Sequence, residues 1–121
     1  MQQPLPINIY RRNKKLYEEV IEFDGAKTTE NSGVVPVPTC EMVMILITNN
    51  TGFEADASLE YKVGEEFASL EFSLMPVGAN TSIVDGPFPF WPLFDGGRIV
   101  LDFGQNVPAN ESTVSIRVQE V

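Results

Sequence analysis

Short runs in which apolar and polar residues alternate are the feature of this sequence that most limits its fold. In residues 57–63 (ASLEYKV), Leu59, Tyr61 and Val63 lie two apart and would share one face of a strand. The same alternation recurs in residues 67–75 and 112–121, and residues 98–103 (RIVLDF) are predicted to be a strand that returns to the core. Alternation of this kind is typical of β-strands that bury one face, so we predict an all-β chain.

Two further runs depend on this context. Residues 41–48 (EMVMILIT) form the most apolar run, too short for a typical helix, and predict a central strand buried on both faces. Residues 14–23 (KKLYEEVIEF) are ambiguous, because Leu16, Val20 and Phe23 fit helical spacing whereas the β-branched and aromatic content suits a strand. The all-β context and the Asp-Gly turn signal that follows favour a strand.

Turn signals separate these runs at fairly even spacing. Residues 26–38 (AKTTENSGVVPVP) are predicted to form a loop, and residues 81–84 a short strand. The whole pattern predicts seven or eight strands in an antiparallel β-sandwich, immunoglobulin-like or jelly-roll-like. We assign residues 16–121 to this single domain.

The aromatic segment, residues 88–94 (FPFWPLF), departs from the alternating pattern. Four of the chain's aromatic side chains lie here, namely Phe88, Phe90, Trp91 and Phe94. They are interleaved with prolines that exclude a helix interior and a central strand. The rings are therefore expected on an irregular loop, where apolar residues are sparse. The loop either caps one end of the sandwich or presents the rings to a partner, and we favour the partner because prolines hinder folding four rings inward.

The first 15 residues differ from the rest in charge. They contain four of the 8 basic residues and none of the 17 acidic ones, which leaves residues 16–121 with a net charge of −13. An acidic body repels nucleic acid, so we expect no nucleic-acid partner. Residues 1–15 are predicted to form an extended basic N-terminal arm, with a solvated tail as the alternative. Its candidate partner-binding residues are Ile7, Ile9, Tyr10, Arg11 and Arg12.

The sequence lacks the usual means of catalysis and metal binding. It has no histidine, and Cys40 is its single cysteine. This removes the commonest general base, the commonest transition-metal ligand and any internal disulfide. Asp85, Asp95 and Asp102 lie around the aromatic segment, but they have no known calcium-site spacing and fit ordinary turns. We predict that the protein is not an enzyme and binds no metal and no cofactor.

Neither a signal peptide nor a membrane span is expected. The N-terminus has no apolar core of the kind that a signal peptide carries. No apolar run approaches the roughly 20 residues that a membrane-spanning helix needs. The expectation is a chain made in a cytoplasm, without membrane contact.

From Met42 onward, the order of signals resembles an immunoglobulin-like sandwich. A buried strand runs into Asn49-Asn50-Thr51-Gly52, an alternating strand follows, and residues 74–81 (LMPVGANT) precede two final strands. The core tryptophan and paired cysteines of antibody domains are missing, so this resemblance is one of architecture.

A small, acidic, cysteine-poor all-β chain with a proline-containing arm is also similar to bacteriophage virion accessory proteins, notably capsid decoration (cement) proteins. This resemblance rests on residues 1–15 and the overall character of the chain. It implies binding to capsid or other virion subunits, or to further copies of the chain, as a homo-oligomer that is often a trimer. It also implies an arm that adds a strand to the shell protein. We therefore predict a structural protein of the virion, made in the host cytoplasm.

Two other functions stay open. A carbohydrate- or ligand-binding module would stack Trp91 on a sugar ring. An acidic inhibitor would mimic nucleic acid through the −13 body.

Overall fold

The computed structural model describes residues 15–23, 25, 28–39, 42–74, 76–89, 95–109 and 113–121, of which 70–73 by their backbone alone. This part of the chain is all-β and contains no helix. Its eight strands are β1 (Lys15–Glu22), β2 (Thr29–Asn31), β3 (Met42–Asn49), β4 (Asp56–Val63), β5 (Glu66–Ser73), β6 (Thr81–Pro89), β7 (Gly97–Asp102) and β8 (Thr113–Glu120).

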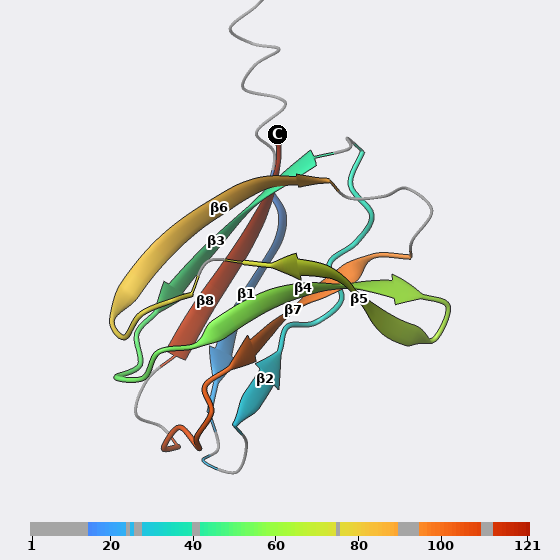
Figure 1. Cartoon of the computed structure of the whole chain (residues 1–121). Coiled ribbons are helices and arrows are strands. Elements are labelled where there is room, and N and C mark those ends of the chain that lie inside the picture. The colour runs from blue at the N-terminus through green and yellow to red at the C-terminus, as the bar shows by residue number, and fades with distance from the viewer. Residues whose placement is uncertain are drawn as a thin grey trace, which may run out of the picture.

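The strands form two four-stranded antiparallel sheets that lie one over the other (Figure 1). Sheet A has the order β1-β8-β3-β6, and sheet B has the order β2-β7-β4-β5. The first strand thus pairs with the eighth, and the second with the seventh. This is the order of an eight-stranded jelly roll, whereas immunoglobulin sheets place the first strand beside the second. The predicted β-sandwich is confirmed, and of the two predicted connectivities the chain has the jelly roll.

The core lies between the sheets and is built from every second residue of the central strands. In β3 and β8, buried and half-buried residues alternate along the whole strand. The wholly buried large side chains come from both sheets and their connections, and include Val43, Ile45, Ile47, Leu59, Tyr61, Ile99, Leu101 and Ile116. Alternation identified the core residues of β4 and β8 in advance, whereas β3 was predicted from its apolar run and not from alternation.

Two predictions about individual strands were wrong. The predicted loop at residues 26–38 contains β2, and Val35 forms a further bridge to Gly97. Strand β2 has only three residues, all polar, so alternation gave no signal for it. Val63 was expected to face inward, but it is 50% exposed because it is the last residue of β4.

The expectation that residues 41–48 are buried on both faces was also wrong. One face of β3 lies in the core, whereas the opposite face is half-buried. A buried second face would require a layer over the outside of sheet A, and the described part of the chain provides none.

Strand β6 runs further than predicted. It continues through residues 85–89, where the sequence suggested an irregular loop. Its register against β3 shifts between Val43, opposite Phe88, and Ile45, opposite Asp85. Because β6 is an edge strand with a bulge here, Pro87 and Pro89 fit without breaking the ladder inside the sheet.

Candidate partner-binding site

The structure places one of the four predicted aromatic residues. Phe88 is half-buried near the end of β6 and packs against the core cluster. This ring therefore lies partly on the body of the sandwich. Phe90, Trp91 and Phe94 lie outside the described residues.

The entry to residues 90–94 is fixed by a bond across the two sheets. The Tyr61 hydroxyl, on β4 of sheet B, donates a hydrogen bond to the carbonyl oxygen of Pro89, on β6 of sheet A. Tyr61 has no exposed surface, and this burial raises the pKa of its phenol from 10.0 to about 12. Like an ordinary phenol, the hydroxyl keeps its proton at neutral pH and is a donor there.

The exit from residues 90–94 is fixed on the same strand. The Asp95 amide donates to the carbonyl of Lys62 at 2.9 Å, and the Gly64 amide donates to Asp95 Oδ2 at 2.9 Å. The Lys62 amide in turn donates to the Gly96 carbonyl at 2.8 Å. Both ends of this five-residue stretch are therefore tied to the end of β4.

Gly96, the residue that follows Asp95, lies close to the backbone of Val35. Its φ is +115°, and a Cβ atom there would lie 2.4 Å from the carbonyl oxygen of Val35. Only glycine adopts this conformation at so short a distance from a neighbouring backbone. Gly96 is thus a packing requirement of the fold.

The arm joins the sandwich at the same end as the aromatic segment. Lys15 begins β1 opposite Gln119 of β8, Gln119 is also opposite Met44 of β3, and Met42 is opposite Pro89. The four strands are about 4.8 Å apart, so the start of β1 and the end of β6 are separated by roughly 15 Å. The candidate arm residues Ile7, Ile9, Tyr10, Arg11 and Arg12 themselves lie outside the described residues.

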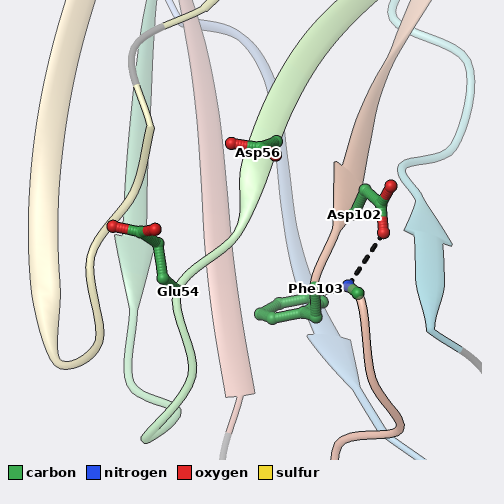
Figure 2. A pocket seen from close by; sticks show the side chains of 5 residues that line it. Glu54, Asp56, Asp102 and Phe103 are labelled. Atoms are coloured by element: carbon green, nitrogen blue, oxygen red, sulfur yellow. Dashed lines mark hydrogen bonds between the residues drawn. The ribbon is translucent and has the colours of Figure 1, made fainter.

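At the other end of the sandwich from Lys15 and Pro89, three carboxylates line a pocket. Figure 2 shows Glu54, Asp56 and Asp102 around it, together with the Phe103 ring. Asp56 and Asp102 lie opposite each other on β4 and β7. No three His, Cys, Asp or Glu side chains among the described residues are close enough to hold a metal ion. The pocket therefore gives no reason to assign a cation.

The aspartates that lie around the aromatic segment in sequence are held at separate places in the structure. Asp85 Oδ1 accepts from the Gly86 amide at 2.9 Å, and Asp102 Oδ1 accepts from the Gly104 amide at 2.9 Å. Asp95 is bonded to Gly64, at the other end of β7 from Asp102. They do not converge on one site. The turn interpretation was wrong for Asp85, which lies within β6, and Asp102 is the last residue of β7.

Sequence reasoning did not identify a second tyrosine contact that closes the edge of the sandwich. The Tyr17 hydroxyl donates to Glu19 Oε1, which also accepts from the Gly33 amide at 2.8 Å. Burial, and then the hydrogen bond to Glu19, raise the pKa of Tyr17 to about 12. The sequence pattern that could have revealed this contact is the spacing of Tyr17, Glu19 and Ile21, which puts all three on one strand face. A carboxylate on an inward face needs hydrogen-bond donors.

Comparison with protein-family models found no match, and comparisons with curated proteins and with solved structures found none either. Among the described residues, no helix is long and apolar enough to cross a membrane.

Proposed function

We propose that this protein is a structural binding protein without enzymatic activity, and specifically a virion accessory protein that decorates or cements a capsid. It docks through two elements, the basic N-terminal arm and the aromatic segment. The arm adds a strand to a shell protein, and the rings fill an apolar site on the shell surface.

The observation that carries this proposal is that Lys15 and Pro89, which adjoin the two elements, lie at one end of the sandwich. The arm precedes Lys15 and the aromatic segment passes Pro89, both at the end of sheet A where β1 begins and β6 finishes. One flat partner surface can therefore contact both at once. Once one element has bound, the other is held close to its own site at a high effective concentration. Two modest contacts on one rigid body can therefore give tight binding.

The fixed ends of residues 90–94 support the same interpretation. Bonds from Tyr61, Lys62 and Gly64 hold Pro89 and Asp95, the residues on either side of this stretch. Fixed attachment points favour binding, because holding a segment's ends in place lowers the entropy that is lost when the segment docks. The jelly roll is compatible with this role because capsid domains use it, although lectins use it as well.

The test is binding to empty shells prepared from the virus that encodes the chain, followed by sedimentation. We expect the full chain to pellet with the shells. Trp91→Ala and the double substitution Arg11→Ser with Arg12→Ser should each weaken binding by about tenfold or more. Asp56→Asn, in the pocket at the opposite end, is the matched control and should bind like the wild type.

Trp91 is the single tryptophan, so its fluorescence reports on the aromatic segment alone. Its emission should shift towards the blue when shells are added and should not change with a panel of glycans. A response to glycans that is lost in Trp91→Ala, without shell binding, would replace the proposal with a carbohydrate-binding module. Shell binding that is unaffected by both sets of substitutions would refute the assigned docking elements.

A further inference from the structure

We propose that the outer face of sheet A, the side turned away from the core, is a contact surface for a second copy of this chain. This inference does not depend on shell binding. It rests on the apolar content of the face, on its low charge and on its area.

The outer face of sheet A carries apolar side chains beside polar ones such as Thr48, Ser82 and Ser115. An antiparallel sheet with one side in water normally alternates apolar inward and polar outward residues. Here the central strand β3 places Met44 and Leu46 on the outer side, both half-buried. Val20 on β1 and Val84 on β6, at the two edges, are 57% and 59% exposed, the highest values among the exposed large hydrophobic side chains of the described residues.

The outer face of sheet B, by comparison, is polar and charged. The outward positions of β4 include Asp56, Glu60 and Lys62. Arg98 of β7 bonds to Glu60 at 2.8 Å and lies 3.9 Å over the ring of Phe67. Glu60 and Arg98 of that face are therefore paired within the chain, and the Phe67 ring is covered by a cation.

Charge favours a second copy at sheet A in particular. Residues 16–121 carry a net charge of −13, so most surfaces of two copies repel each other. Across the middle of the outer face, the register aligns Glu18, Arg117, Leu46 and Val84 in one row. This row is electrically neutral, and half of it is apolar.

Arg117 at the centre of the row is incompletely bonded. Its Nη1 lies 3.8 Å from Glu18 Oε2, and its Nε is buried without a hydrogen-bond partner. A hollow beside it is lined by Leu46, Thr48 and Ser115. In a pair related by a twofold axis, each Arg117 lies within reach of Glu18 of the second copy, and the hollow accepts an apolar side chain from that copy.

The area is sufficient for a specific contact. The strands of sheet A have 8 or 9 residues. At about 3.3 Å per residue and about 4.8 Å between strands, the face measures roughly 26 by 19 Å, or about 500 Å². Two such faces bury roughly 1,000 Å² together, which is the lower limit for a specific interface. We therefore expect a weak, reversible dimer.

The experiment is sedimentation equilibrium of the full chain over a range of concentrations. We expect the mass to rise from that of one 13.4 kDa chain towards that of two. Added salt should strengthen the dimer, because it screens the repulsion between the acidic bodies. A trimer, or a monomer up to the solubility limit, would overturn the proposal.

Substitutions at exposed valines locate the contact without disturbing the core. Val20→Glu and Val84→Glu should each raise the dimer dissociation constant by about tenfold or more, because each places an unpaired carboxylate in the contact. Val63→Glu is the matched control, since this valine is 50% exposed on β4 of sheet B and the charge change is identical. Equal weakening by all three would mean that net charge alone sets the association, and the assignment to sheet A would be wrong.

Exchanging the charges of Arg117 and Glu18 tests the proposed contact between Arg117 of one copy and Glu18 of the other. Arg117→Glu alone should abolish the dimer, and the double substitution Arg117→Glu with Glu18→Arg should restore it. Circular dichroism of each variant verifies the fold. Failure of the double variant to dimerise while folded would exclude the reciprocal pairing.

Discussion

Asn49 is a buried polar residue that holds a turn and a neighbouring loop together. Only 1% of it is exposed, at the end of β3. Its Nδ2 donates to the carbonyls of Phe53 at 2.8 Å and Gly78 at 3.1 Å, and its Oδ1 accepts from the Thr51 amide at 2.9 Å. A side-chain amide supplies the two N–H donors and the acceptor oxygen that these three bonds require. The Asn-Asn-Thr-Gly turn was recognised from the sequence, but the sequence did not indicate which asparagine is buried.

Asn49→Asp should therefore destabilise the fold strongly. The substitution keeps the shape of the side chain, removes both N–H donors and buries a carboxylate next to carbonyl oxygens. We expect a loss of about 3 kcal/mol in the free energy of unfolding, measured by urea denaturation. Asn50→Asp, one residue later and exposed, is the control and should change stability by less than about 0.5 kcal/mol. Similar losses for the two variants would contradict the assigned role.

Tyr61 makes the stability of the fold depend on pH in the alkaline range. The pKa of its phenol is 10.0 in the unfolded chain and about 12 in the folded one. Between these values the unfolded chain loses the proton first, so the free energy of unfolding falls from about pH 10 to about pH 12. Below pH 10 both states keep the proton, and this group contributes no pH dependence. Tyr17 has the same shift and adds to the fall.

Tyr61→Phe should reduce this alkaline loss and, at neutral pH, cost about 1 kcal/mol for the hydrogen bond to Pro89. The measurement is urea denaturation at a series of pH values for the wild type, Tyr61→Phe and Tyr17→Phe. Each substitution should remove part of the fall, and the double variant most of it. An unchanged slope in Tyr61→Phe would mean that its phenol is not desolvated in the folded protein.

At the scale of elements, the segments beside the aromatic residues depend on close contacts between backbones. Before the aromatic residues, the edge strand β6 has a bulge near its end. After them, the chain enters β7 at Gly96, whose backbone lies against that of Val35. Strands with strict alternation, such as β4, β7 and β8, could be predicted from the sequence because one apolar face determines them. Strand β2 and the end of β6 could not, since one is polar throughout and the other contains prolines that usually mark loops.

Gly96→Ala should destabilise this region far more than the same change elsewhere. The new Cβ would meet the Val35 carbonyl at 2.4 Å, in a backbone conformation that alanine avoids. We expect a loss of about 3 kcal/mol or more by urea denaturation, together with an altered Trp91 emission. Gly104→Ala is the control, because its φ is +68° and no atom lies within 4 Å of the new Cβ. It should cost only about 1 kcal/mol, and equal losses would refute the packing argument.

At the scale of the whole molecule, the sequence predicted the layers but left the connectivity open. Alternation shows which side of a strand is buried and carries no information on which strand lies beside it. The pairing of β1 with β8 depends on contacts between residues far apart in the sequence, such as Ile21 and Val114. For the same reason, the placement of Lys15 and Pro89 at one end of sheet A appeared only in the structure. The partner itself stays a prediction, because the aromatic and basic residues chosen for it follow from composition and not from the fold.

The insertion of β8 between β1 and β3 has a consequence for how the chain folds during synthesis. A ribosome completes β1 and β3 long before residues 113–120 emerge, so sheet A cannot close while the chain is growing. Until then, both strands have an unpaired edge towards the position of β8, and such edges pair readily with other chains. Folding of sheet A is therefore a late, long-range event, of the kind that proceeds slowly and favours aggregation of incomplete chains.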